Sequence, residues 1–351
     1  MSGRYDAEAL TAVVADLFER LGLEAEKAER TARTLVEADA IGHATHGLAI
    51  APWYAEELRS GNMRPSGAPE TISDTGSCLA WNGRRLPGAW LIHRALDIGM
   101  ERVATNGGIF AATIGDGHHT GALATYQVRA AERGLFAIIA CSGPASQGVA
   151  PFGGRDGVFT PNPLSAGIPT NADPILLDLS ASISTIKRST QMAERGEVYE
   201  HDWVLDAEGN PSRDPRDLLE RGGTLMPVGG LDHGHKGYGM ALLVEAMTQG
   251  LSGVGRRQVM TGISMNTFVL LLDPASFGGS EAFRDEMSWL ADACRASRPR
   301  PNVDRVRLPG DRALALRAAA LAEGVPLSSA IVSALGPCLA RSGLAMPDPI
   351  A

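Results

Sequence analysis

The chain contains 351 residues, of which 44% are hydrophobic and 21% are charged, and 40 acidic against 32 basic residues give a formal charge of −8 at pH 7. This composition is typical of a globular protein with enough residues for two domains and at least one large core. The charges form no long runs of one sign, which argues against nucleic acid or an anionic membrane surface as the main partner.

Two further patterns concern the location of the protein and its metal content. No run of roughly 20 apolar residues occurs, and the N-terminus has no secretory pattern, so a cytoplasmic protein without a membrane segment is expected. The four cysteines lie far apart and form no C-x-x-C pair, which indicates neither a zinc knuckle nor a disulfide framework.

Helical periodicity dominates the first sixty residues. Apolar positions that recur every three or four residues predict a helix from Asp6 to Leu21, which Gly22 closes. A second helix is expected over about 24–40 and a third over about 48–58, ending near Gly61. We therefore expect this end of the chain to be all helical.

Short apolar runs alternate with helical patterns in the middle of the chain. Strands are predicted over 108–114, 135–140, 175–179 and 266–272, with one helix over about 122–133 and another after Tyr238. From about residue 280 the pattern is helical again, with helices predicted over 313–321 and 328–344. We predict an α/β domain over residues 71–279, inserted into a helical domain formed by residues 1–70 and 280–351.

The segment Gly234-His-Lys-Gly-Tyr-Gly239 comes directly before the apolar run 240–244 and is expected at the start of a helix. The first N–H groups of a helix lack partners and carry the positive end of its dipole, so this start and Lys236 would bind a phosphate or carboxylate. A tight glycine turn packed under the helix is an equally weighted alternative.

Six of the eight histidines fall in close pairs, which is a pattern that metal sites also show. However, the sequence contains no H-E-x-x-H helix, and the nearby carboxylates lack the spacing of metal ligands. We therefore expect no catalytic metal.

The segment Gly115-Asp-Gly-His-His-Thr-Gly121 lies between a predicted strand and a predicted helix, where a dinucleotide-binding fingerprint would stand. Its spacing is one residue too long, and the next strand brings no acidic residue to hold a ribose, so we reject a Rossmann fingerprint. His119 at this turn remains a candidate general acid or base, with a packed or solvent-facing histidine as the more frequent alternative.

Thr45-His46-Gly47 stands at the expected start of the third helix. A helix N-terminus disfavours imidazolium, which would keep His46 neutral and suited to proton transfer. Thr45 would cap the helix or orient the ring. A capping threonine beside a solvent-facing histidine is at least as well supported by these residues alone.

Seven segments, taken in chain order, resemble the malate/L-lactate dehydrogenase family, whose members lack a Rossmann fold. They are Ala44-Thr-His-Gly47, Gly117-His-His-Thr-Gly121, Pro151-Phe-Gly-Gly-Arg155, Pro161-Asn-Pro163, Asp178-Leu-Ser-Ala-Ser182, Gly234-His-Lys-Gly-Tyr-Gly239 and Leu308-Pro-Gly-Asp-Arg312. Each motif is weak alone, but together they span nearly the whole chain. The resemblance implies an α/β fold with a mixed sheet in a non-Rossmann NAD(P)-binding domain, and hydride transfer between NADPH or NADH and a C=O or C=N carbon.

The resemblance also implies roles for particular residues. His46 would be the proton donor with Thr45 as its relay partner, and His119 would be a second acid/base group or substrate contact. Cofactor contacts would come from Asp178, Leu179, Ser180, Ala181, Ser182, His235, Lys236, Pro309, Gly310 and Asp311. Relatives are homodimers with the active site near the subunit interface, so the same assembly is implied here.

The chain departs from the family around its substrate. Ile50 stands where relatives usually carry an arginine that holds the substrate carboxylate. Loss of such a pair costs about 1.5 to 3 kcal/mol, so an ordinary 2-oxo acid is expected to bind poorly. The expected substrate-binding residues are Ile50, Tyr54 and Arg188. Either Arg188 supplies the missing cation, or the substrate presents no carboxylate there.

The expected function is therefore an NAD(P)H-dependent oxidoreductase that acts on a 2-oxo or 2-hydroxy acid, a ketone or a cyclic imine, with an atypical small-molecule substrate. The main alternative is a non-catalytic relative that keeps the nucleotide pocket for binding. A histidine-metal hydrolase is the third and least favoured hypothesis.

Overall fold

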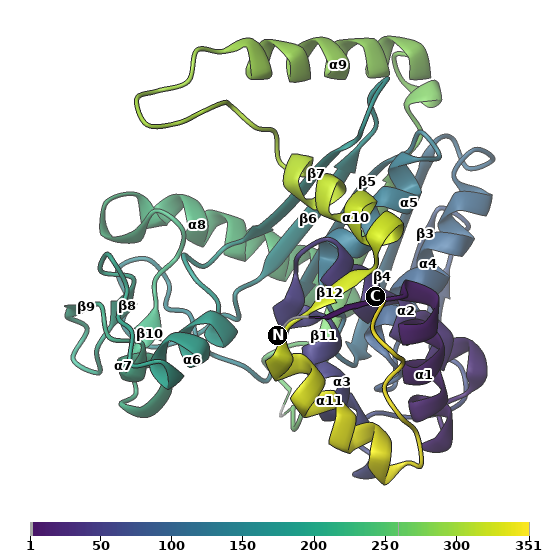
Figure 1. Cartoon of the computed structure of the whole chain (residues 1–351). Helices are drawn as coiled ribbons and strands as arrows, with labels where there is room; N and C mark the ends of the chain where they lie inside the picture. Colours follow the sequence, from purple (N-terminus) through teal and green to yellow (C-terminus); the bar gives the residue numbers. More distant parts are fainter. Residues whose placement is uncertain (1–2, 259, 351) are drawn as a thin grey trace.

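The computed structural model describes residues 3–258 and 260–350. A seven-stranded sheet forms its centre (Figure 1), with the order β2 (Glu70–Asp74), β3 (Cys78–Asn82), β4 (Ile109–Gly117), β11 (Met265–Leu272), β5 (Phe136–Ser142), β6 (Pro163–Ile168), β7 (Ile175–Ser180). Strands β3 and β4 are parallel, and the other neighbouring pairs are antiparallel. The expected α/β class with a mixed sheet is therefore confirmed.

The middle of the sheet is buried on both faces, which explains why β11 reads as a continuous apolar run. On one face Val269 and Leu271 belong to the core under α4 (Gly88–Arg102), and on the other Phe268 packs with Val244. The four predicted strands are found within a few residues of their expected bounds. Strand β2 escaped prediction because all five of its side chains are exposed and show no apolar alternation.

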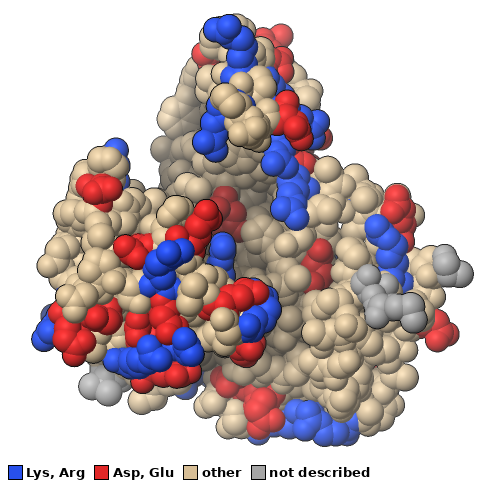
Figure 2. Space-filling model, turned by 60° about the vertical axis from the view of Figure 1, so that its left-hand side comes forward, with Lys and Arg blue, Asp and Glu red and all other residues tan. Residues whose placement is uncertain are grey.

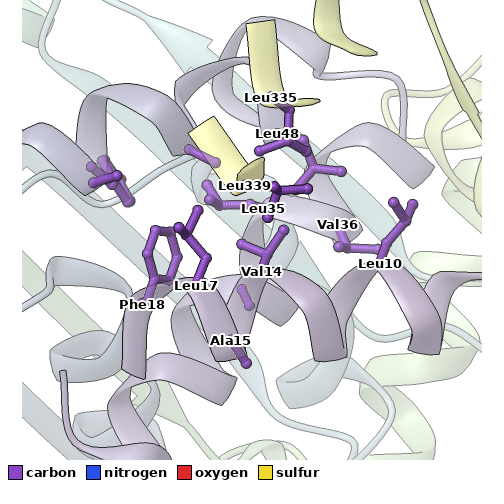
Figure 3. Close-up of a cluster of buried hydrophobic side chains, with 14 of the residues drawn as sticks. Leu10, Val14, Ala15, Leu17, Phe18, Leu35, Val36, Leu48, Leu335 and Leu339 are labelled. Carbon is purple, nitrogen blue, oxygen red and sulfur yellow. The ribbon is translucent and has the colours of Figure 1, made fainter. Parts of the chain in front are cut away.

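The two ends of the chain share one hydrophobic core. Helices α1 (Ala7–Arg20), α2 (Ala25–Ala40) and α3 (Ala51–Arg59) pack with α11 (Ser329–Arg341), as Figure 3 shows for Leu335 and Leu339 beside the leucines of α1 and α2. The Asp6 side chain caps α1 by accepting a hydrogen bond of 2.8 Å from the Ala9 N–H. The domain bounds at residues 70 and 280 stay predictions.

The expectation that the first sixty residues are all helical is wrong at one place. Strand β1 (Gly3–Tyr5) pairs in antiparallel fashion with β12 (Val325–Leu327), so the two chain ends are also joined by a small sheet. The helix predicted over 122–133 is also shorter than expected, with a 3₁₀ turn η3 (Leu123–Tyr126) followed by α5 (Gln127–Ala131).

A smaller lobe lies on the left of Figure 1 and is formed by residues 183–229 with the start of α8 (Gly230–Glu245). It contains α6 (Ile186–Glu194), α7 (Pro215–Glu220) and a three-stranded sheet of β8 (Val204–Leu205), β9 (Pro211–Ser212) and β10 (Thr224–Leu225). Helix α8 runs back from this lobe into the π turn η4 (Ala246–Gly250), which packs on the sheet.

The predicted start of α8 is wrong. The helix begins at Gly230 after Gly229, whose φ of 101° ends the preceding turn, so Gly234-His-Lys-Gly-Tyr-Gly239 lies inside the helix and offers no free N-terminal N–H groups. Two of its glycines, Gly234 and Gly237, lie where another part of the chain packs closely. A Cβ on Gly237 would overlap the backbone of Val228 and Ala181.

Beyond the sheet, the last 3₁₀ turn η5 (Pro274–Ser276) leads into α9 (Ser280–Ala296), which Figure 1 shows at the outer edge of the molecule. Of its side chains only Ala291 is fully buried, while Trp289 and Leu290 are exposed. The chain then returns through α10 (Asp311–Glu323), which packs on α2.

Candidate active site

Two histidines that are far apart in the sequence meet in one cavity. His46 ends the 3₁₀ turn η1 (Ala44–His46), which leads through η2 (Leu48–Ile50) into α3, and His119 follows the end of β4. Their rings lie nearly parallel, with 5.9 Å between centroids and 11° between planes. They share a cavity of about 270 Å³ that is lined by Thr45, His46, Ala49, Ile50, Trp53, His119 and Lys187.

His46 is neutral in the free protein at pH 7. Burial lowers its pKa to about 4, and the charges of His43 and Lys187 add to this effect. Thr45 Oγ1 lies 3.1 Å from His46 Nδ1, which leaves Nε2 as the ring nitrogen available to a substrate. Burial, rather than the helix start considered in the sequence, is the main cause of the neutral state.

His119 is fixed in one tautomer by its neighbours. The Gly121 backbone N–H donates to His119 Nδ1 over 3.3 Å, and the Tyr54 hydroxyl oxygen lies 2.7 Å from the same nitrogen. Because a backbone N–H can only donate, Nδ1 must be an acceptor, and the neutral ring carries its proton on Nε2. Burial lowers the pKa of His119 to about 3, with help from His46 and His118. His119 is therefore a hydrogen-bond donor at neutral pH.

A buried carboxylate holds the turn that carries His46. Asp39 Oδ2, near the end of α2, accepts a hydrogen bond of 2.7 Å from the Leu48 N–H. A Cβ on Gly47 would overlap this carboxylate, which explains the glycine after His46. Burial raises the pKa of Asp39 to about 7. Sequence reasoning missed Asp39, although an aspartate among the apolar residues of Ala38-Asp-Ala-Ile41 was a signal.

A contact between Glu57 and His118 fixes the side of the cavity that α3 and the segment after β4 form. Glu57 Oε2 on α3 lies 3.1 Å from Nε2 of the fully buried His118, which ties this helix to the segment after β4. Trp53 packs against both histidines of that segment, with ring centroids 5.6 Å from His118 and 5.3 Å from His119. No local motif in the sequence indicated this pairing.

The expected substrate residues occupy different places. Ile50 lines the cavity, whereas Tyr54 lies behind His119 and is itself fully buried. The Arg188 guanidinium lies over the Trp203 ring, 5.5 Å from its centroid, and Arg188 does not line the cavity. The cation that does line it is Lys187, the second residue of α6, which is not among the expected substrate-binding residues.

The three expected cofactor segments lie along β7. Asp178 to Ser182 cover the end of this strand, and the Val228 N–H donates to Ala181 O over 2.8 Å beside the α8 turn that carries His235 and Lys236. At the strand's other end the Leu176 N–H donates to Pro309 O over 3.2 Å, next to Gly310. Asp311 follows at the start of α10 and pairs with Arg295 at 2.8 Å.

These segments supply groups that suit a nucleotide. Asp178 offers a carboxylate acceptor for ribose hydroxyls, and Lys236 offers an exposed cation for a phosphate. The hydroxyls of Ser180 and Ser182 lie 2.7 Å from each other, and Ser182 is buried. His43 Nδ1 lies 3.7 Å from Asp178 Oδ2, which connects this row of groups to the turn of His46. Figure 2 shows one face of the molecule with a hollow that has acidic and basic side chains around it.

Two further observations concern metals and membranes. In residues 3–258 and 260–350, no three His, Cys, Asp or Glu side chains gather in a way that could hold a metal ion. Among the same residues, no helix has the length and apolar character needed to cross a membrane.

Comparison with known proteins adds independent evidence. The profile of the family described as malate/L-lactate dehydrogenase matches residues 5–336. The L-lactate dehydrogenase of Cupriavidus necator is 31% identical over 314 residues, covering 87% of this chain and 88% of that protein. The (2R)-3-sulfolactate dehydrogenase (NADP(+)) of Chromohalobacter salexigens is 32% identical over 342 residues, covering 93% and 95% of the two chains.

The fold is likewise shared with a solved structure. The malate dehydrogenase of Pyrococcus horikoshii superposes with a TM-score of 0.87 at 24% sequence identity, covering 99% of this chain and 97% of that one. At this identity the likeness supports the fold alone.

Proposed function

The chain belongs to the malate/L-lactate dehydrogenase family and is an oxidoreductase, and from this premise we propose that it interconverts a 2-hydroxy acid and a 2-oxo acid with NADH or NADPH in the His46–His119 cavity. A ketone or a cyclic imine is the alternative reducible group. The observation that carries the proposal is the pair of stacked neutral histidines, because each presents one ring nitrogen to the same small cavity.

The two histidines have different tasks in this proposal. In the oxidative direction the substrate loses its C2 hydrogen as a hydride and its hydroxyl hydrogen as a proton, and a C=O bond forms. Neutral His46 accepts the proton at Nε2, with Thr45 holding its other nitrogen. His119 donates an Nε2–H hydrogen bond to the reacting oxygen and does not change its protonation. In the reductive direction His46 must first be protonated.

A nicotinamide cofactor, when bound, supplies the two-electron chemistry by accepting or giving the hydride. Its ribose and phosphate groups would be held by the Asp178–Ser182 strand end, by His235 and Lys236, and by Pro309, Gly310 and Asp311. The order of these segments along β7 supports this assignment. Parallel titration with NADH and NADPH distinguishes which of the two cofactors the protein binds.

The test combines binding and turnover. Titration with NADH and NADPH in parallel should give a saturable change in nicotinamide fluorescence for at least one of them. His46→Ala should lose about 10²- to 10⁴-fold in kcat while it keeps the cofactor affinity. Unchanged turnover in His46→Ala would refute the assigned role, and absence of binding for both cofactors would refute the proposed function in favour of a non-redox one.

We also propose that the protein is a cytoplasmic homodimer that uses α9. The helix exposes Trp289 and Leu290 and buries only Ala291 fully, which is unusual for a helix of 17 residues in a monomer. Sedimentation analysis should therefore give a dimer mass, and Trp289→Glu should shift it toward the monomer. Glu281→Gln on the same helix is the control. A monomeric wild-type protein would contradict this proposal.

A further inference from the structure

The cavity of His46 and His119 has two chemically different walls. Thr45, His46 and His119 form a hydrogen-bonding wall, whereas Ala49, Ile50 and Trp53 form an apolar one. The apolar wall is held in place by the protein core, because Ile50 and Trp53 both pack against the buried cluster of α1, α2 and α11. A substrate must therefore present its reacting oxygen to one side and an apolar group to the other.

Lys187 is the only Lys, Arg, Asp or Glu among the described residues that line this cavity. Within residues 3–258 and 260–350 its ammonium group makes no ion pair and no side-chain hydrogen bond. The neighbouring cation is engaged elsewhere, since Arg188 lies over Trp203. In the part of the chain that the structure describes, the cavity thus contains one cation without a protein partner.

The position of Lys187 is fixed by its helix. Thr185 caps α6 by accepting a hydrogen bond of 3.2 Å from the Arg188 N–H, which places Lys187 in the first turn at the cavity. Its charge is close enough to His46 to contribute to the lowered pKa of that ring. An anion that pairs with Lys187 would cancel part of this effect, so binding would also raise the pKa of His46.

We infer that Lys187 binds the substrate carboxylate and that the site prefers monoanionic 2-hydroxy and 2-oxo acids with an apolar side chain over dianions. The inference rests on the proposed function, whose reaction and His46 role it keeps. One cation balances one carboxylate. A second carboxylate or a sulfonate would lose its hydration against Ala49, Ile50 and Trp53 without a partner. The volume of about 270 Å³ favours a small acid, because ligand pockets usually measure about 300 to 1,000 Å³.

The experiment measures kcat/KM in the oxidative direction for four substrates with both enantiomers of each. They are 2-hydroxy-4-methylpentanoate, its neutral methyl ester, malate and 3-sulfolactate. The wild-type protein should prefer the 4-methylpentanoate over both dianions. Lys187→Met should lower kcat/KM for this acid by about 10- to 100-fold, mainly through KM, and should change the value for the ester much less.

Two further variants are the controls for Lys187→Met. Lys187→Arg keeps a cation and should retain most of the activity toward the acid. Arg195→Met removes an exposed cation that pairs with Glu197 at the end of the same helix, and it should leave all four values unchanged. Titration with the nicotinamide cofactor shows whether each variant still folds and binds.

The results distinguish failure of the inference about Lys187 from failure of the proposed dehydrogenase activity. A wild-type preference for malate or sulfolactate would overturn the inference while it confirms the dehydrogenase activity. Equal losses for the acid and its ester in Lys187→Met would also overturn it, because they indicate a structural role for the lysine. Failure of the wild-type protein to bind either cofactor and to oxidise any of the acids would overturn the proposed function itself.

Discussion

Single residues set the protonation state on which the proposed chemistry depends. For the free protein, the pH dependence of kcat/KM in the oxidative direction reports the base that accepts the proton. Burial and Lys187 lower the pKa of His46 to about 4, so it is neutral and active from pH 7 down to well below the ordinary histidine value. We expect the acid limb of the profile near pH 4.

The same profile in Lys187→Met provides a control for this assignment. Loss of the neighbouring positive charge removes one cause of the lowered pKa, so the acid limb should move to higher pH. An acid limb near pH 6.5 in the wild-type protein would contradict the lowered pKa of His46, and no movement in the variant would show that the titrating group is not the one beside Lys187. Initial rates over pH 3 to 8, with pre-incubation at each pH to check stability, decide between these outcomes.

Asp39 gives a separate prediction about stability. Burial raises its pKa in the folded state to about 7, whereas the unfolded chain titrates near 3.8. Between these values the folded protein binds more protons than the unfolded one, so this group makes the folded state less stable as pH rises from about 4 to 7. The upper limit of the effect is about 4 kcal/mol, since one pKa unit corresponds to about 1.36 kcal/mol.

Asp39→Asn removes this titration and keeps an oxygen that can accept from the Leu48 N–H. The difference in free energy of unfolding between Asp39→Asn and the wild-type protein should therefore be more favourable to the variant at pH 8 than at pH 5. Urea unfolding at the two pH values measures this difference. Asp39→Ala is the contrast, because it also removes the titration but loses the hydrogen bond, so it should be less stable than Asp39→Asn by about 1 to 3 kcal/mol at both pH values. A constant difference between wild type and Asp39→Asn would contradict the raised pKa.

Candidate site residues that lie in local motifs could be predicted from the sequence, whereas residues that meet only in the folded chain could not. Thr45, His46 and His119 lie in short recognisable segments. Lys187 borders the cavity because the start of α6 lies near η1 in the folded chain. Glu57 contacts His118, which lies 61 residues later in the sequence. Such contacts leave no local pattern, so composition and periodicity cannot show them.

At the scale of elements, the position of α4 over the sheet depends on one glycine. A Cβ at Gly99 would overlap the side chains of Phe110 on β4 and Leu271 on β11. Gly99→Ala should therefore push α4 from the sheet and destabilise the protein by about 1 to 3 kcal/mol, although alanine favours a helix. Urea unfolding measures the change. Gly336→Ala in α11, where a Cβ would meet no atom within 4 Å, is the matched control and should not be destabilised.

Element boundaries show where periodicity fails. The predicted strands were found because the central sheet is buried on both faces and its strands are apolar. Helix α8 began eight residues before Tyr238, because its first turns, Gly230-Leu-Asp-His-Gly234, have no helical apolar pattern. Here tertiary packing against Val228 and Ala181 overrides the low helix propensity of glycine. The anion site expected at the start of this helix is therefore absent from that segment, whereas the Lys236 side chain is still exposed and able to bind an anion.

At the scale of the whole molecule, the proposed cofactor site joins parts that are distant in the chain. Its residues come from β7, from α8 beside the smaller lobe and from the start of α10. A ligand that binds only the folded state stabilises it by about 2.7 kcal/mol when its concentration is 100 times Kd. Because these segments belong to several elements, we expect NADH or NADPH to raise the thermal midpoint of the protein as a whole.

Lys236→Met tests whether the exposed lysine of α8 contributes to this stabilisation. If Lys236 pairs with a cofactor phosphate, the variant should need roughly tenfold or more cofactor for the same increase in the thermal midpoint, because a charge-assisted hydrogen bond contributes about 1.5 to 3 kcal/mol. Its stability without cofactor should be unchanged, since the side chain is exposed. Arg94→Met on α4 removes a cation outside the three segments and should not alter the response. An equal response in Lys236→Met and wild type would remove α8 from the cofactor site and leave the Asp178 segment and Pro309 to Asp311 as its remaining candidates.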